Sequence, residues 1–242
     1  MSNFRFTKPE AFPPIIKNLI IINVLVWLAQ LMYDKQFDLT SKLGLWTIQV
    51  DQFKPYQFAT HMFAHASYDP FGRIVFLHIF FNMFTLWMFG RILENVWGAK
   101  RFLFFYLACG IGAAICHEAV QYFRYEDVMA QINTAFQNGN MERAQEIVNQ
   151  NGIGPAVGAS GAVMGVMVAF ALLFPNTELY MMFIPIPIKA KWAIMAFVAL
   201  DLFGGFGRFS GDNIAHFAHL GGALTGFIIV MIWNKGNRKT LY

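Results

Sequence analysis

Among the polar side chains that fall within otherwise apolar stretches of this sequence are those of Ser160, His219, His78 and Asn82. Polar groups inside a lipid-embedded helix are costly and usually mark function. A histidine beside a serine can accept the hydroxyl proton and make the serine oxygen a nucleophile. His78 and Asn82, spaced i, i+4, project from one helical face and can donate hydrogen bonds to a developing oxyanion. Ser160 and His219 are therefore the candidate nucleophile and base, and the other two are candidate oxyanion donors.

Small residues surround the serine and follow the histidine at matching intervals. Ser160 lies in the run Gly158–Gly165, whose glycines recur at i, i+3 and i+7, and His219, Gly222 and Gly226 repeat that spacing. Faces without side chains let two helices approach closely, so this pattern can bring the imidazole to the hydroxyl. A helix-packing motif with an incidental serine is the alternative interpretation of the first run.

No carboxylate lies close to His219 along its own segment. The nearest is Asp212, seven residues or about 10 Å away along a helix axis, which predicts a serine–histidine dyad rather than a triad. His216 and His219 are spaced closely enough to share a metal, as are His61 and His65. Neither pair has a third ligand nearby in the sequence, so we expect no metal site.

The composition predicts a membrane protein with several spans. Hydrophobic residues make up 57% of the 242 residues and charged residues only 13%, with a mean hydropathy of +0.45. Soluble domains carry about 25% charged residues, so this chain lacks the polar surface that water requires. The basic residues form no run of the kind that nucleic-acid-binding proteins show, so no nucleic-acid partner is expected. The start of the chain lacks a cleavable signal pattern, and we expect the first apolar stretch to remain as an anchor.

Six apolar segments approach the length of about 20 residues that a bilayer span needs, and the fifth is the shortest. They predict an all-α bundle of six transmembrane helices. The shorter connections hold most of the lysines and arginines, which places both termini in the cytoplasm. The segments are Ile15–Met32, Ile74–Leu93, Phe102–Phe123, Pro155–Phe174, Trp192–Phe206 and Ile214–Trp233.

This orientation divides the chain into an N-terminal cytoplasmic segment (1–14), a six-span domain (15–233) and a cytoplasmic tail (234–242). The outer segment Tyr33–Arg73 is expected to form short amphipathic pieces in the membrane interface. The outer segment Arg124–Gly154 has two helical stripes that Asn138-Gly139-Asn140 breaks, which predicts a helical hairpin outside the membrane.

The orientation also places the four polar residues at a common depth. The second, fourth and sixth spans then run from the outside inward, and each polar side chain lies within the first eight or so residues of its span. At 1.5 Å per residue this corresponds to roughly 6–12 Å below the outer surface. The orientation was inferred from loop charge alone, without reference to these residues. Their common depth therefore supports a single shared site.

Taken together, the motifs resemble those of the rhomboid intramembrane serine proteases. The sequence has Gly-x-Ser-Gly at Ser160, His-x-x-Gly-x-x-x-Gly at His219 and His-x-x-x-Asn at His78. The likeness covers nearly the whole chain. It includes Thr60-His61-Met62-Phe63 before the second span and a Pro185-Ile186-Pro187-Ile188 turn before the fifth.

The resemblance implies a six-span rhomboid-like bundle in which Ser160 is the nucleophile and His219 the general base. It assigns the oxyanion hole to His78, Asn82 and the backbone N–H of Ser160. The implied activity is cleavage of transmembrane segments of other membrane proteins near the outer face, in a bacterial inner membrane and without a cofactor. Helices with small or helix-breaking residues near the interface are the expected substrates, because they can unwind.

Three features depart from the family pattern, and none touches the dyad. Tyr56-Gln57 stands where the family often has Trp-Arg, Met164 replaces a frequent aromatic, and the segment between His65 and His78 is longer than usual. These departures bear on efficiency and substrate preference.

The family resemblance also suggests how a substrate reaches the serine. It implies that the fifth span is the gate, where Phe197 and Phe203 would provide packing and Gly204–Gly207 a hinge.

Two other functions are compatible with these features. A catalytically silent rhomboid-like protein that binds membrane clients is the first, although such relatives typically lack the serine or the histidine. A six-span transporter is the second, although no repeated halves are visible. The oligomeric state and the substrate identities do not follow from the sequence.

Overall fold

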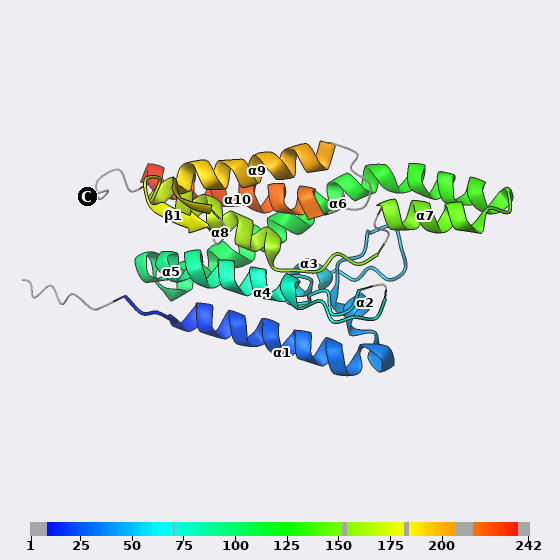
Figure 1. Ribbon diagram of the computed structural model, residues 1–242, viewed down its shortest axis with the longest axis horizontal. Coiled ribbons are helices and arrows are strands. Elements are labelled where there is room, and N and C mark those ends of the chain that lie inside the picture. Colours follow the sequence, from blue (N-terminus) through cyan, green and yellow to red (C-terminus); the bar gives the residue numbers. More distant parts are fainter. Residues whose placement is uncertain (1–8, 70, 152–153, 182–183, 207–214, 237–242) are drawn as a thin grey trace, which may run out of the picture.

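The computed structural model describes residues 9–69, 71–151, 154–181, 184–206 and 215–236. The longer helices lie roughly along one common direction, shown horizontally in Figure 1. The start of α1 and the β1–β2 hairpin lie at one end of this bundle. The short helices α2 and α3 and the α6–α7 hairpin lie at the other end.

The described part of the chain is mostly helical, and its elements follow one another in this order: α1 (Pro14–Phe37), α2 (Leu39–Leu43), α3 (Gln57–Thr60), α4 (Phe76–Thr85), the π-helical turn η1 (Leu86–Gly90), α5 (Arg91–Trp97), α6 (Ala99–Gln137), α7 (Met141–Asn151), α8 (Ser160–Leu173), β1 (Glu178–Met181), β2 (Ile184–Lys189), α9 (Ala190–Phe206) and α10 (Ala215–Gly236).

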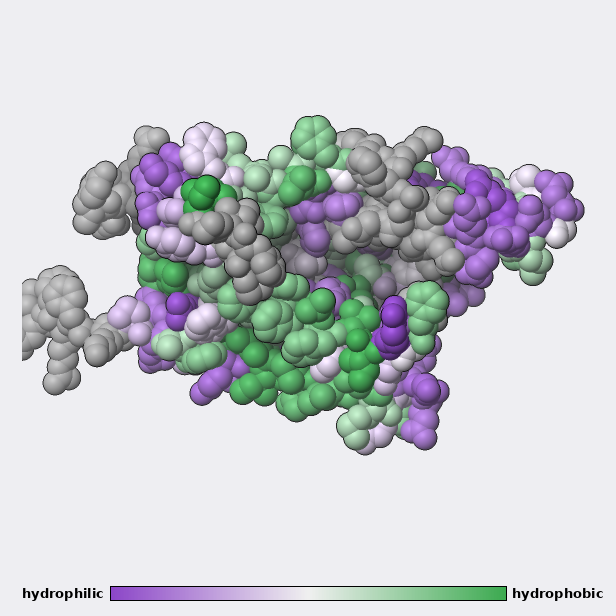
Figure 2. Space-filling model, viewed as in Figure 1, coloured by the Kyte–Doolittle hydropathy of each residue, from purple (hydrophilic) through white to green (hydrophobic). Residues whose placement is uncertain are grey.

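All six predicted spans fall largely on helices. Four helical stretches in the described residues are long and apolar enough to cross a membrane: Pro14–Phe37, Phe76–Trp97, Ala99–Gln137 and His216–Lys235. Helix α8 is apolar but shorter. Figure 2 shows the consequence on one face, where hydrophobic side chains form a continuous area over α1 and α4. The chain is a multi-pass membrane protein.

The third predicted span is part of a longer helix. Helix α6 does not stop near Phe123 but continues unbroken to Gln137. It then turns back through residues 138–140, where Gly139 has a φ of +68° that favours glycine. The expected helical hairpin is confirmed, but it is an extension of α6 with α7 packed against it. It has its own small buried cluster, made of Val128, Ile132, Ala135, Ala144 and Ile147.

A short β-hairpin corrects the all-α prediction. The predicted turn Pro185-Ile186-Pro187-Ile188 lies within strand β2, which pairs antiparallel with β1 in the register Leu179↔Ile188. Each strand of a two-stranded ribbon has an open edge, and a proline is tolerated in such a strand where its nitrogen faces that edge. The ribbon connects α8 to α9.

Glycines bring α8, α10 and α6 into close contact. A Cβ atom added at Gly226 would lie 2.8 Å from Gly165 Cα, and one added at Gly222 would overlap the carbonyl of Gly161. On its other side α10 approaches α6, where a Cβ added at Gly221 would lie 2.9 Å from a backbone carbonyl oxygen. The predicted small faces are therefore confirmed as the surfaces by which α8 and α10 meet.

Helix α9 packs beside α10 and α8 and covers the start of both. Its two phenylalanines do not contribute equally to packing. Phe197 is 40% exposed, whereas Phe203 is 71% exposed and has little packing to lose. The expected packing role of Phe203 is therefore wrong. Gly204 lies within the helix, and Gly207 lies outside the described residues.

Candidate active site

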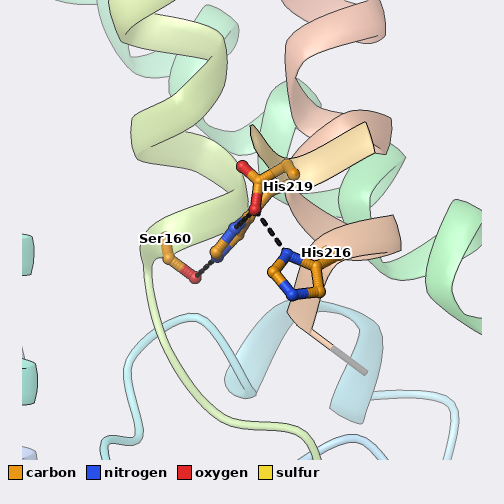
Figure 3. A network of polar contacts seen from close by, with 4 residues as sticks. Ser160, His216 and His219 are labelled. Carbon is orange, nitrogen blue, oxygen red and sulfur yellow. Dashed lines mark hydrogen bonds and ion pairs between the residues drawn. The ribbon is translucent and has the colours of Figure 1, made fainter. Parts of the chain in front are cut away.

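Ser160 and His219 lie in direct contact. Ser160 Oγ is 2.8 Å from His219 Nε2, and Figure 3 shows the two side chains pointing toward one another from α8 and α10. The predicted pair, 59 residues apart in the sequence, is thus brought together by the glycine contact between those helices.

Ser160 is the first residue of helix α8, whereas the predicted fourth span begins five residues earlier, at Pro155. Residues before Ser160 run as an irregular strand, in which Ala156 pairs with Leu45 by two backbone hydrogen bonds of 2.8 and 2.9 Å. Helix α8 begins at Ser160 itself. The first N–H groups of a helix have no intrahelical acceptor, and the helix dipole places partial positive charge there. The backbone N–H of Ser160 is therefore at the position where a helix attracts an anion.

A carboxylate that the sequence analysis did not anticipate completes the arrangement. Asp201, on α9, places Oδ1 3.0 Å from Nδ1 of His219. It is 8% exposed. Asp212, the carboxylate that the sequence analysis judged too distant to pair with His219, lies outside the described residues. The dyad prediction considered carboxylates along the sixth span only, and so did not anticipate a contact from α9.

This carboxylate determines which nitrogen of His219 carries the proton. A carboxylate oxygen accepts, so Nδ1 of His219 donates to Asp201 and the neutral ring keeps a lone pair on Nε2. The Ser160 hydroxyl then donates to that lone pair. The sequence of bonds from Ser160 through His219 to Asp201 is the arrangement that serine hydrolases use, recognised by geometry rather than by order in the sequence.

His216 binds the same carboxylate oxygen. Its Nδ1 is 2.7 Å from Asp201 Oδ1, so one oxygen accepts from two imidazoles. Figure 3 shows His216 one turn before His219 on α10, with its ring turned away from Ser160. In the described residues, His219 but not His216 contacts the serine.

His78, at the start of α4, lies beside the serine loop. A Cβ atom added at Gly158 would be 3.1 Å from His78 Nε2 and 3.7 Å from Ser160 Oγ. Gly158 has a φ of +133°, which disfavours any other residue. The N–H of Ala66 donates to His78 Nδ1 at 3.2 Å, so the neutral ring carries its proton on Nε2. That N–H faces the loop that leads into the nucleophile.

Asn82 has a more local set of contacts. Its Nδ2 donates to the carbonyl oxygen of His78 at 2.9 Å, one turn earlier in α4. Its Oδ1 is buried with no hydrogen-bond partner among the described residues. Asn82 thus shares a helical face with His78, as its spacing predicts. The second hydrogen of its amide group takes no part in the bond to the His78 carbonyl.

The segment that precedes α4 supports both sides of the site. The carbonyl of His61 accepts from the N–H of Gly158 at 2.9 Å, and the N–H of His65 donates to Gln30 of α1 at 3.0 Å. Burial, with a smaller contribution from the neighbouring His78, lowers the pKa of His65 to about 3, so this imidazole is neutral at physiological pH. These contacts fix the loop before Ser160 and the position of His78 together.

Two buried polar residues, one in the outer segment and one on α6, have contacts that the sequence analysis did not anticipate. Gln57, 1% exposed, accepts from the backbone N–H of Trp46 and of Lys54, and it donates to nearby carbonyls. Glu118 of α6 accepts from the N–H of Ile48 at 3.0 Å. Gln57 belongs to the Tyr56-Gln57 pair that stands in place of Trp-Arg, and its hydrogen bonds hold this loop together. Glu118 attaches the same loop to α6.

Comparison with known proteins places the sequence in a family. It matches the rhomboid domain over residues 52–235. Rhomboid protein 1, mitochondrial, of Saccharomyces cerevisiae is 28% identical over 171 residues, which cover 71% of this chain and 42% of that protein. The human presenilin-associated rhomboid-like protein, mitochondrial, is 28% identical over 182 residues, covering 72% and 39%. RHOMBOID-like protein 12, mitochondrial, of Arabidopsis thaliana is 27% identical over 224 residues, covering 92% and 59%.

These matches cover less than two thirds of each relative's own length. The match to the rhomboid domain, over residues 52–235, includes His78, Asn82, Ser160, Asp201 and His219. A match over most of the sequence, on a chain with several apolar helices, identifies the family: this protein belongs to the rhomboid family.

Proposed function

We propose that this protein is an intramembrane serine endopeptidase that cleaves transmembrane segments of other membrane proteins near the outer membrane face. The observation that supports it best is the hydrogen-bonded series from Ser160 through His219 to Asp201, at 2.8 and 3.0 Å. Such an arrangement supplies a nucleophile, a base with its lone pair correctly placed, and a group that stabilises the charged base.

The reaction would begin with attack of Ser160 Oγ on a peptide carbonyl carbon. His219 Nε2 accepts the hydroxyl proton as the carbon–oxygen bond forms, and Asp201 stabilises the resulting imidazolium. The backbone N–H of Ser160, the Nε2–H of His78 and the free amide hydrogen of Asn82 would donate to the carbonyl oxygen as it becomes negative. The imidazolium then gives its proton to the departing amine, and a water activated by the same imidazole hydrolyses the acyl enzyme.

Substrate access would occur beside α9. This helix covers α8 and α10 with one side and exposes Phe197 and Phe203 on the other. A disulfide between the outer parts of α4 and α9 should block cleavage of a transmembrane substrate and still permit a small fluorophosphonate to react with Ser160. Normal cleavage by the cross-linked protein would exclude α9 as the access element.

We further propose that all six apolar segments cross the membrane, with residues 1–14 and 234–242 in the cytoplasm of a bacterial cell and the site toward the outer face. Helices α8 and α9 are shorter than a full span, so the bilayer would have to be locally thin or the ends covered by loops. Cysteines introduced one at a time at exposed positions near the start of α1 and the end of α10 should react only with a membrane-permeant thiol reagent. Labelling by an impermeant reagent in intact cells would contradict this orientation.

The activity can be tested in liposomes that contain the purified protein and a single-span substrate. The substrate would carry either a Gly-Ala pair or a Leu-Leu pair near the outer end of its helix. Because cleavage requires local unwinding, the Gly-Ala form should be cut faster, and mass spectrometry of the fragments should place the cut near the outer interface. If neither substrate is cut, or if the Ser160→Ala variant cuts as fast as the wild type, the proposed function is wrong.

A further inference from the structure

Asp201, His216 and His219 form a cluster that the protease mechanism does not fully use. One ring nitrogen of each histidine and a carboxylate oxygen of Asp201 all lie within 4.8 Å of one another, and both Nδ1 atoms contact Oδ1 of Asp201. His216 contributes nothing to the contact with Ser160, yet its Nδ1 is the closer of the two nitrogens to Asp201 Oδ1. Two helices, α9 and α10, thus direct three potential metal ligands toward one point.

The ligand types fit zinc. Zinc binds imidazole nitrogen and carboxylate oxygen at about 2.0–2.2 Å, usually with tetrahedral geometry, and sites with two histidines and one carboxylate leave a fourth position for water. Small movements of these three side chains would convert the present hydrogen-bonded contacts into such a site. The sequence predicted no metal site because no third ligand lies near His216 and His219 along the chain. Asp201 supplies that third ligand from a different helix.

The cluster is also open enough to receive an ion. The side chains of His216 and His219 are 19% and 22% exposed, and that of Asp201 is 12% exposed. Partial exposure lets a hydrated ion reach the ligands, while partial burial strengthens the attraction between a dication and the carboxylate.

We propose that Asp201, His216 and His219 form an inhibitory zinc site. Zinc would take the Nδ1 lone pairs of both imidazoles and an oxygen of Asp201. A neutral imidazole that binds a metal through Nδ1 carries its proton on Nε2. For His219 this proton would lie on the atom that faces Ser160, so the ring could no longer accept the hydroxyl proton. Each ring moves its proton from Nδ1 to Nε2, and no proton is gained or lost.

The site would therefore switch off the base without covering the nucleophile. The inhibition rests on the proposed protease function, whereas zinc binding does not. Binding is best measured on Ser160→Ala protein, which lacks the proposed nucleophile but keeps all three ligands.

The experiment is a calorimetric titration of purified Ser160→Ala protein with ZnCl₂ and, separately, with MgCl₂. We expect one zinc ion per chain and no comparable binding of magnesium, which prefers oxygen ligands in octahedral geometry. Adding His216→Asn, which keeps a hydrogen-bond donor but removes the imidazole, should weaken zinc binding on the order of 10- to 100-fold or more, since even outer-shell changes at metal sites have effects of this size.

Cys116→Ser is the matched control, because Cys116 of α6 is a half-buried potential zinc ligand that lies against α10 at Gly221 and is not a member of the cluster. It should leave zinc binding unchanged. With the intact Ser160 protein, zinc should slow both substrate cleavage and fluorophosphonate labelling, EDTA should restore them, and His216→Asn should lose this inhibition relative to its own zinc-free rate.

Three results would overturn the inference. The first is no saturable zinc binding to the Ser160→Ala protein. The second is zinc binding that Cys116→Ser removes and His216→Asn does not. The third is binding that depends on His216 but leaves the rate of an active wild-type enzyme unchanged, which would exclude inhibition. If zinc binds as expected but no form of the protein cleaves or is labelled, the proposed protease function fails and the metal site remains.

Discussion

Asp201 and His219 are joined by a 3.0 Å hydrogen bond that connects α9 to α10 at the level of the serine. The bond places a buried carboxylate on the helix that covers the site and an imidazole on the helix that presents the base. It therefore couples the position of α9 to the tautomer of His219. A movement of the outer part of α9 that breaks this bond would also remove the group that keeps the lone pair on Nε2.

Replacing Asp201 tests this coupling. In Asp201→Asn an amide can donate to Nδ1 and favour the tautomer with the proton on Nε2, which cannot act as the base. We expect kcat to fall by about 10²–10⁴ with KM nearly unchanged, as expected for loss of correct tautomer and charge at an otherwise intact site. A thermal unfolding measurement in detergent would show whether the protein is still folded. A normal kcat in a folded Asp201→Asn protein would show that Asp201 has no positioning role.

The two histidines of α10 should differ in their effect on activity. His219→Ala removes the only imidazole in contact with Ser160 among the described residues, so cleavage should be abolished. His216→Ala leaves the Ser160–His219 contact in place and should retain much of the activity. Initial rates on one transmembrane substrate, with both variants at equal folded concentration, provide the comparison. Loss of activity in His216→Ala together with retention in His219→Ala would reassign the base.

Asn82→Ala tests the oxyanion role. The loss of one donor typically costs about 10²–10³ in rate, and other donors remain, so turnover should slow without disappearing. Asn82 also donates a hydrogen bond to the carbonyl oxygen of His78, so the thermal stability of the variant is a second readout beside its rate. A wild-type kcat in this variant would leave Asn82 with a packing role only.

The hairpin formed by the end of α6 and by α7 should be dispensable for chemistry. It carries none of the site residues and has its own buried cluster. The contacts that hold the outer segment to α6 precede it, at Glu118 and at the Tyr122 carbonyl, which accepts from Gln49. A Gly/Ser linker in place of residues 125–153 should keep fluorophosphonate labelling within about fivefold of wild type, by analogy with other exposed, self-contained insertions. A folded variant without labelling would show that the hairpin supports the site.

Much of this arrangement could be predicted from the sequence because it depends on local spacing. The i, i+3, i+7 glycines predict the close contact of α8 with α10, and that contact brings together residues 160 and 219. The break at Asn138-Gly139-Asn140 predicts the outer hairpin. Helix boundaries were less accurate. The pattern did not reveal that α8 begins at Ser160, since residues 155–159 carry no charged or polar side chain to mark the boundary.

Asp201 was missed for a different reason. It lies 18 residues before His219 on another helix, and the contact depends on how α9 packs against α10, which no spacing within one helix determines. A signal was nevertheless present: a lone carboxylate within an apolar segment is costly in a membrane and usually has a partner and a function. Considering every charged residue within the spans would have identified it.

The central claim is that Ser160 is a nucleophile activated by His219, and covalent labelling tests it most directly. Purified protein would be treated with a tagged fluorophosphonate, and the modified peptide would be located by mass spectrometry. We predict a single adduct on Ser160 in the wild type, none in Ser160→Ala, and labelling at least about 100-fold slower in His219→Ala, in line with the cost of losing a general base. An adduct on a different residue, or an equal rate of labelling of Ser160 in His219→Ala, would contradict the account.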